Sequence, residues 1–523
     1  MKSLRKKLGE MVGINPLRWT ASVRDVLAFA DQIATHSAQH AGAVPAKRSI
    51  GIVVNCWLTT WVPWYSIIVG LLLSSRGNKI VFIFDDLPFS DSPVVSAFIR
   101  SCIRRVLRRL SRRHWVITVS EHLSGDAPMP RDAGAHINRL AELNAVHRMR
   151  GEMVAEGRAA YTALVHGQLT AAFPAIAATL DKIECDAVVV PGGVYGTSGL
   201  WLYAGTERGI RVSSFDAGSG IMLLAAHGIA AQLQDIPRGF EQLKRHGEGA
   251  ELDSFMVMKA RGEIEKRHGG RSAFNYQQAA KSERALDPYK GAVLIALNSS
   301  WDQAALGLHV VFRNSAEWIV ESVRWILQNT ESSVVVRQHP SERFELTRTT
   351  DDYEKLLRGE FGANSRVHFI AAADPINTYD LLSVASCVLA YTSTFGVEAT
   401  ALRKPTIVAS SCYYANLGFV WSDRSAESYF DHLAQAIRGD LLVTPARERD
   451  ALLCYYATQV CNWIFTPFNP VSDDFFRRSV ADLSAARDVD LILEVIETGT
   501  PACVLNHQRS IQETPIDMQP VNA

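Results

Sequence analysis

Apolar runs that end at polar clusters recur along the second half of this 523-residue chain. Val334–Val336 is a β-branched run, typical of a strand buried on both faces, and it ends in the sequence Arg-Gln-His-Pro at 337–340. Cys387–Tyr391 is predicted to be a second buried strand, and it is followed by three hydroxyl residues, a helical stretch and a third apolar run at 406–409. Because strand, polar tip and helix alternate, the pattern predicts an α/β fold with a parallel sheet covered by helices.

The first half opens with an apolar stretch that has two interpretations. Ser49–Ser75 carries no charged residue, and hydropathy alone would make Ile52–Leu73 a transmembrane helix. Asn55 and Pro63 interrupt the run, however, and its start is β-branched. We therefore expect a Rossmann-like opening unit, with a strand over 50–55, a helix over 63–76 and a strand over 79–84.

The length of the chain predicts more than one domain, because 523 residues exceed what a single core usually serves. The segment 235–290 is polar and charged, and we place the linker there, ending near 290. The expected division is a helical extension over 1–48, a first Rossmann-like domain over 49–288, a second over 289–470, helices over 471–500 and a disordered tail over 501–523.

The amino-acid composition limits the class of protein and the compartment in which it works. Apolar residues make up 47% and charged residues 21%, as in a soluble globular protein, and the formal net charge is zero, so the chain as a whole offers no pull toward nucleic acid. The eight cysteines lack CxxC or zinc-type spacing, which favours reduced thiols in the cytoplasm and predicts no metal site. Met1–Pro16 is basic but has no apolar core, so we expect no secretory signal.

One predicted helix is strongly cationic. Ile99–Arg113 has apolar residues at helical spacing from Ile99 to Leu110, and its other faces are almost wholly arginine. Solvated surface arginines would explain this pattern, and so would a patch for anionic lipid head groups or a polyanionic, lipid-linked acceptor. The scarcity of local acids favours the patch and a peripheral place at the inner face of the plasma membrane. The candidate patch residues are Arg104, Arg105, Arg108, Arg109 and Arg112.

Thr392, Ser393 and Thr394 lie where a predicted strand passes into a helix. A helix start presents unpaired N–H groups and a partial positive charge, so it favours an anion, and the hydroxyls add donors. Gly396 keeps the first turn open to a phosphate, and Glu398 is close enough to accept bonds from ribose hydroxyls. Serine and threonine are also ordinary helix caps, so this motif alone does not decide the function.

His339 strengthens the case for an anion site. It follows Arg337 at the end of a strand, at the sheet edge where the hydroxyl motif is also predicted. An imidazole can donate to a phosphate oxygen and a guanidinium can hold its charge, as a departing nucleotide requires. The sequence therefore predicts that the two motifs converge on one phosphate, with His339 as a candidate catalytic residue.

A catalytic carboxylate is harder to identify from the sequence. Asp216 ends the predicted strand 210–215, beside glycines that would let a ligand approach the backbone closely. It is the candidate base or nucleophile for a transfer reaction, although a simple turn residue explains the pattern equally well.

These motifs together resemble a known family. Asn298–Asp302, Val335–Pro340 and Ala390–Glu398, with Lys404-Pro405, are similar to the capsule polysaccharide biosynthesis family, which includes bacterial Kdo transferases and shares its His-Pro and Ser/Thr motifs with bacterial sialyltransferases. The resemblance covers about 290–415, and the first half only by its α/β pattern. It implies a GT-B architecture, in which two Rossmann-like domains face each other across a cleft.

In that resemblance the first domain would bind the acceptor and the second the nucleotide sugar. His339 would contact the nucleotide phosphate, Ser393 and Thr394 would help to bind it, and Glu398 would contact the ribose. Donors in the family are often CMP-activated acidic sugars, and neither a metal nor a further cofactor is implied.

The expected activity is glycosyl transfer in capsule or surface polysaccharide synthesis, with Kdo or another acidic sugar moved from a nucleotide donor to a lipid-linked or glycan acceptor. A sugar-nucleotide 2-epimerase, a polyol-phosphate transferase with a CDP-linked donor and a non-catalytic GT-B subunit remain the alternatives. The cationic helix argues against the epimerase, which needs no membrane-bound acceptor.

Overall fold

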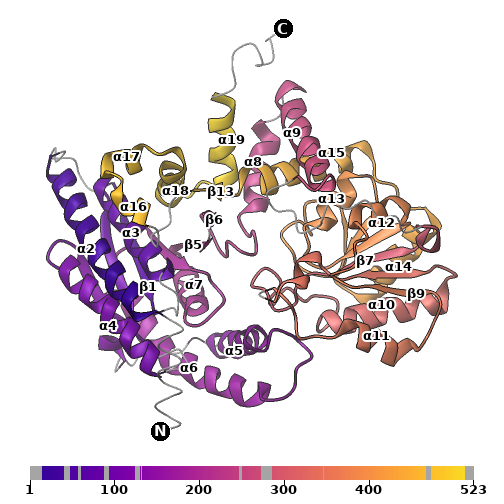
Figure 1. Cartoon of the computed structure of the whole chain (residues 1–523), viewed down its shortest axis with the longest axis horizontal. Helices are drawn as coiled ribbons and strands as arrows, with labels where there is room; N and C mark the ends of the chain where they lie inside the picture. The colour runs from indigo at the N-terminus through magenta and orange to yellow at the C-terminus, as the bar shows by residue number, and fades with distance from the viewer. Residues whose placement is uncertain are drawn as a thin grey trace. The chain divides into compact units, whose positions relative to one another are not determined.

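The computed structural model consists of two compact units, each built on its own sheet, and Figure 1 labels their elements. Unit 1 comprises Met1–Asn144, Ala160–Asp235 and Asn462–Arg509, and unit 2 comprises Ala145–Ala159, Ile236–Cys461 and Ser510–Ala523. The expected α/β class with two parallel-sheet domains is confirmed. The structure describes residues 15–39, 47–56, 61–87, 93–123, 130, 132–218, 220–246, 250–271, 286–345, 347–466 and 473–512.

The sheet of unit 1 has the strand order β13-β6-β5-β4-β1-β2-β3. The strands from β5 to β3 run parallel, whereas β6 is antiparallel to β5 and β13 is antiparallel to β6. The central strands are buried almost throughout, as their uninterrupted apolar sequences predict. The bounds are β1 Ser49–Asn55, β2 Lys79–Asp85, β3 Trp115–Thr118, β4 Ala187–Pro191, β5 Arg211–Gly218, β6 Ile221–Ala225 and β13 Ile464–Phe465.

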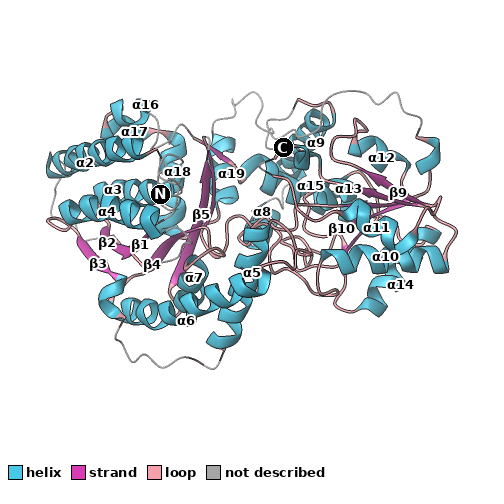
Figure 2. Cartoon of the chain, turned by 60° about the horizontal axis from the view of Figure 1, so that its bottom comes forward, coloured by secondary structure: helices cyan, strands magenta, loops and turns pink. Residues whose placement is uncertain are grey.

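Helices cover both faces of this sheet (Figure 2). One apolar cluster joins it to the helices α2, α3 and α4 and to the carboxyl-terminal helices, and a second joins its other face to α5, α6 and α7. The bounds are α2 Pro16–Gln39, α3 Trp61–Ser75, α4 Pro93–Leu110, α5 Ala133–Met149, α6 Arg158–Lys182, α7 Ser198–Glu207, α16 Asp473–Arg477, α17 Val480–Ala485, α18 Arg487–Thr498 and α19 Ala502–Gln512; a 3-10 turn spans Val119–His122.

The uncharged stretch that begins at Ser49 forms β1 and α3, with β2 after them, so the expected strand-helix-strand unit is confirmed. A different helix, α6, is long and apolar enough to cross a membrane by length and composition, and half of that stretch is buried in the structure. A buried core helix of a globular protein has the same properties.

The sheet of unit 2 has the order β12-β11-β10-β7-β8-β9, and all of its paired strands are parallel. Its core lies between this sheet and α10, α11 and α14. The strands are β7 Val293–Ala296, β8 Val334–Arg337, β9 Val367–Ile370, β10 Cys387–Ala390, β11 Thr406–Val408 and β12 Trp421–Ser422. The helices are α8 Ile236–His246, α9 Ala250–His268, α10 Ser315–Asn329, α11 Tyr353–Phe361, α12 Thr378–Val384, α13 Phe395–Ala401, α14 Ala426–Arg438 and α15 Pro445–Tyr455, with 3-10 turns at Asp287–Tyr289 and Pro340–Arg343 and a π-helical turn at Tyr456–Cys461.

The division differs from the expected one: the segment 145–159, expected in the first domain, belongs to unit 2, and the helices before 49 and after 470 belong to unit 1. The helices α8 and α9, expected before the boundary near 288, belong to unit 2 because they pack on α15 and the π-helical turn after it. Ion pairs join the same elements: Lys244 Nζ lies 2.7 Å from Asp450 Oδ2, and Arg261 Nη2 lies 2.5 Å from Glu448 Oε1. The second domain also ends at 461 rather than 470, because β13 pairs with β6 of unit 1.

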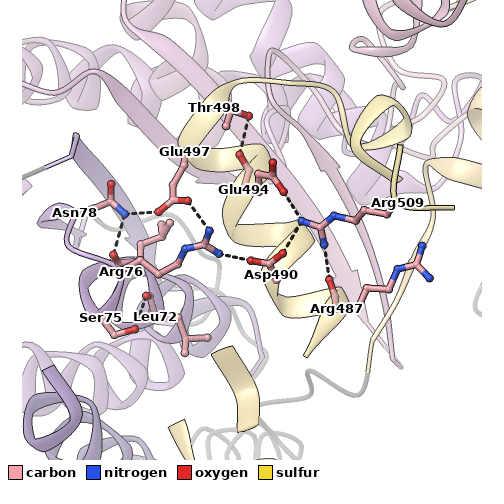
Figure 3. Close-up of polar contacts among 11 residues, drawn as sticks. Leu72, Ser75, Arg76, Asn78, Arg487, Asp490, Glu494, Glu497, Thr498 and Arg509 are labelled. Carbon is pink, nitrogen blue, oxygen red and sulfur yellow. Dashed lines mark hydrogen bonds and ion pairs between the residues drawn. The ribbon is translucent and has the colours of Figure 1, made fainter. Parts of the chain in front are cut away.

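The expectation of a disordered tail after 500 was wrong for 502–512, which form α19. Burial of Cys503 and Leu505 anchors this helix, and a polar network ties it to α18 (Figure 3). Arg509 Nη2 lies 2.6 Å from Asp490 Oδ2 and also pairs with Glu494, while Arg76 Nη1 lies 2.8 Å from the other oxygen of Asp490. The rest of the expected tail, 513–523, lies outside the described residues.

Candidate functional site

The two motifs singled out in the sequence lie at the same edge of the unit 2 sheet. Strands β10 and β8 flank β7, and the register aligns Ala390 and Arg337 with the same residue, Ala296. Because parallel strands end at one edge, the loops after all three strands start side by side. A bond from the N–H of Thr392 to Asn298 Oδ1, 3.4 Å long, links the hydroxyl motif to the loop after β7.

His339 caps the 3-10 turn that follows β8. Its Nδ1 accepts a bond from the Ser341 N–H at 3.2 Å and lies 2.6 Å from Ser341 Oγ. Burial, reinforced by the guanidinium groups of Arg337 and Arg267, lowers the pKa of His339 to about 4. The imidazole is therefore neutral near pH 7, and because Nδ1 accepts, its proton resides on Nε2.

Arg337 is buried and does not have the role that its sequence position suggested. Its guanidinium donates to the carbonyl oxygens of Ala371, Asp374 and Ile376, the last two at 3.3 and 3.2 Å. Burial lowers its pKa to about 10, so it stays charged at neutral pH. Arg337 thus holds the loop after β9 in place and acts on His339 through its charge, instead of offering its donors to a ligand.

The hydroxyl motif Thr392–Thr394 is half-buried, and hydrogen bonds to neighbouring residues hold Ser393 in place. Ser393 Oγ accepts from the N–H of Phe395 at 3.2 Å, and the Ser393 carbonyl accepts from the hydroxyl of Tyr414 at 2.7 Å. Gly396 is required by that tyrosine, since a Cβ there would lie 2.4 Å from the hydroxyl oxygen of Tyr414. The glycine therefore accommodates Tyr414, whereas the sequence suggested that it leaves room for a phosphate.

Glu398 is buried, and both of its carboxylate oxygens have a partner. Oε1 accepts from Arg267 Nη1 at 2.5 Å, and Oε2 accepts from the Tyr379 hydroxyl at 2.6 Å. This arrangement differs from the expected ribose contact, because Glu398 positions an arginine.

Arg267 is the residue of this site that sequence reasoning missed. It lies at the end of α9, in the segment interpreted as a linker, and its other nitrogen Nη2 donates to Gln459 at 2.9 Å. Its Nε is buried without a hydrogen-bond partner among the described residues. Because its charge helps to lower the pKa of His339, it brings a second cation beside the His-Pro motif. Nothing in its local sequence marks it, since Lys266 and His268 flank it in an ordinary basic helix end.

A second polar cluster supports the other side of the motif. The hydroxyl of Tyr391 bonds to His309 Nδ1, His309 Nε2 lies 2.9 Å from Glu152 Oε1, and Glu152 Oε2 accepts from the first N–H of α10 at 2.7 Å. Asp351 accepts from the N–H groups of Glu152 and Met153 at 2.7 and 2.9 Å. These contacts fasten the segment 145–159, which leaves unit 1 between α5 and α6, onto unit 2.

Asp216 lies in unit 1, and the structure places it differently from the sequence prediction. Strand β5 continues to Gly218, so Asp216 is exposed within a hairpin ladder opposite Leu223 rather than at a strand tip. Asp85, the carboxylate that does end a strand, is buried and accepts from Thr197 Oγ1 at 2.5 Å and from Trp201 Nε1 at 2.8 Å. Within the part of the chain that the structure describes, no cluster of three potential metal ligands occurs.

The chain has two α/β units, and its match to a protein family lies mostly in the second. Residues 227–442, which include α8, α9 and both motifs, match the family model described as capsule polysaccharide biosynthesis protein. The family recognised from the sequence is thereby confirmed. No curated protein matches the chain.

Several solved structures are similar to the chain. The KpsC β-Kdo 2,4-transferase of Thermosulfurimonas dismutans is 16% identical, with 51% of this chain and 79% of that chain covered at a TM-score of 0.35. The β-Kdo 2,7-transferase of the same organism is 16% identical over 54% and 79%, with a TM-score of 0.29. The UDP-GlcNAc 2-epimerase of Neisseria meningitidis is 12% identical over 78% and 95%, with a TM-score of 0.22.

Proposed function

We propose that the chain is a glycosyltransferase of capsule or surface polysaccharide synthesis, and that unit 2 binds its nucleotide-sugar donor at the carboxyl edge of β7, β8 and β10. The observation that carries the proposal is the placement of His339 and the Thr392–Thr394 hydroxyls on either side of β7, with Arg267 close enough to His339 to shift its pKa. The family match supports the class of reaction.

The chemistry follows from charge. When the bond between a sugar and its nucleotide breaks, negative charge grows on the departing phosphate, and donors already aimed at that oxygen lower the barrier. A neutral His339 with its proton on Nε2 would donate to the phosphate oxygen, and its pKa would rise as the anion forms, which strengthens the bond. Arg267, fixed by Glu398 and Gln459, would supply the balancing charge.

The finer assignments extend this proposal. A CMP-linked acidic sugar such as Kdo is the proposed donor, a lipid-linked or glycan chain is the proposed acceptor, and neither a metal nor a further cofactor takes part. Ser393 and Thr394 would donate hydroxyls to the phosphate. Asp216 remains the candidate base, although its place within β5 gives it no special support.

Thermal shift with CMP, CDP, UDP and GDP tests the proposal. A ligand present at a hundredfold over its Kd stabilises the folded state by about 2.7 kcal/mol, which raises the Tm of a unit of this size by about 5–10 °C. His339→Ala should abolish that shift and lower transfer about a hundredfold or more, while the Tm without ligand falls only by the few degrees that the lost cap bond to the Ser341 N–H accounts for. His368→Ala is the matched control, because this half-buried histidine lies within β9, opposite Val335.

A His339→Ala variant that keeps the nucleotide shift would remove the site assignment. Reversible epimerisation of a UDP-sugar by the wild-type protein, without transfer to any acceptor, would replace the proposed reaction.

A further inference from the structure

The arginines of the cationic helix α4 fall into two sets that the sequence alone does not separate. The apolar stripe of the helix, which includes Ile99, Ile103 and Leu110, is buried against the sheet of unit 1. A turn continues the chain past the end of the helix: the N–H of Ser111 donates to the Leu107 carbonyl at 2.8 Å, as in an α-helix, and the N–H of Arg113 donates to the Leu110 carbonyl at 2.9 Å, in the tighter pattern of a turn. Arg104, Arg105, Arg108 and Arg109 therefore lie on α4 itself, and Arg112 lies in the turn that directly follows it.

The first set lies on the flanks of the helix and is paired with carboxylates. Arg104 Nη2 is 3.2 Å from Asp86 Oδ2 on one flank. On the other flank Arg109 and Arg113 share Asp31 of α2, at 3.3 and 3.7 Å. Two of the five candidate patch residues, Arg104 and Arg109, thus already have a counter-ion within unit 1.

The second set consists of Arg105, Arg108 and Arg112, which are exposed. None of them has a carboxylate partner among the described residues. At about 100° per residue they lie within one 60° sector, on the side of the helix opposite the buried stripe. They span about 10 Å along the helix axis. We call these three residues the arginine ridge.

We propose that the arginine ridge is an electrostatic docking surface for the anionic head groups of a membrane. The ridge lies on a helix whose apolar side is already buried in the core, so it has no apolar face to insert and suits an array of phosphates at a surface. Each arginine near an anionic surface raises the membrane partition constant about fivefold, so the three residues together should raise it roughly a hundredfold. This proposal does not rest on the proposed transferase activity.

Sedimentation with phosphatidylcholine vesicles, with and without phosphatidylglycerol, measures the effect. The triple variant Arg105→Gln, Arg108→Gln and Arg112→Gln should lose roughly a hundredfold in partition to the anionic vesicles, and wild-type binding should weaken as salt is raised. Glutamine keeps the helix propensity, so the fold is retained. The matched control is Arg313→Gln, Arg358→Gln and Arg438→Gln, which removes the same charge from three exposed arginines of unit 2.

A variant that should bind anionic vesicles more tightly provides a second test. Asp31→Asn frees Arg109 and Arg113 from their shared carboxylate, so it should strengthen partition to the anionic vesicles several-fold. Equal losses in the ridge triple and the control triple would show that only net charge matters and would overturn the proposal. A ridge triple that loses binding to dextran sulfate but not to vesicles would identify a soluble polyanion as the partner and would overturn it as well. Nucleotide thermal shifts should be unchanged in all of these variants.

Discussion

Replacement of Glu398 tests whether this residue positions Arg267, as the structure indicates, or contacts the ribose of a nucleotide, as the family resemblance implies. The carboxylate has a side-chain exposure of 4%, Arg267 has one of 16%, and the two are joined by a 2.5 Å bond. Glu398→Ala removes one member of a buried pair and leaves a guanidinium without its counter-charge, which typically costs about 3–5 kcal/mol. Glu398→Ala also removes the bond from the Tyr379 hydroxyl, but this bond is part of the same network, so its free energy is included in that cost.

A loss of about 4 kcal/mol corresponds to a drop of about 8–16 °C in the melting transition of a unit of this size. Urea unfolding followed by hydrogen exchange of peptides from unit 2 measures the loss in the unit concerned, which matters because a two-unit chain need not unfold in one step. The double variant Arg267→Met with Glu398→Met should recover most of the stability, because it removes both charges.

The expected pattern for Glu398→Ala is therefore a less stable unit 2 that also binds nucleotide weakly, since Arg267 is no longer held beside His339. Wild-type stability in Glu398→Ala, together with selective loss of nucleotide affinity, would refute this reasoning. That result would make Glu398 a ligand contact, as the family resemblance implies.

Two further predictions concern the same sheet edge. Gly396→Ala should destabilise unit 2 by about 1–3 kcal/mol, because the added methyl group would collide with the Tyr414 hydroxyl. Tyr414→Phe removes that hydroxyl, so the double variant should recover part of the lost stability. If urea unfolding shows that the two losses simply add, the steric argument is wrong. Since the pKa of His339 is lowered to about 4, the unfolded chain binds the proton more readily, so this residue leaves stability unchanged above pH 6.5 and lowers it as pH falls from 6.5 to 4. His339→Ala should flatten that part of a Tm-against-pH profile, and an unchanged slope would show that the imidazole titrates normally.

Sequence patterns were sufficient for the parts of the fold that depend on local chemistry. The apolar runs Val334–Val336 and Cys387–Ala390 form strands. The β-branched start of the uncharged stretch from Ser49 forms β1, and the part after Pro63 lies in α3. The placement of both motifs at one sheet edge followed from parallel pairing.

What the sequence did not predict depends on long-range partners. Arg267 reaches the motif only because α9 packs on α15, a contact between segments almost two hundred residues apart. The hydrophilic composition of 235–290 suggested a linker, since each of its helices exposes much of its surface. The split of the α4 arginines likewise depends on Asp31 and Asp86, which come from two other elements.

The charges around His339 explain why this edge of the sheet favours an anion over a cation or a neutral ligand. Arg337 donates to backbone carbonyls, and Arg267 donates to Glu398 and Gln459. Both guanidinium groups nevertheless lower the pKa of the imidazole, so the electrostatic potential at His339 remains positive. A phosphate group bound there would offset that potential and raise the pKa of His339. Binding of a nucleotide should accordingly be accompanied by proton uptake below neutral pH, and the uptake should vanish in His339→Ala. Calorimetric titration in two buffers of different ionisation enthalpy measures it, and equal heats in both buffers near pH 5 would mean that the imidazole does not sense the phosphate.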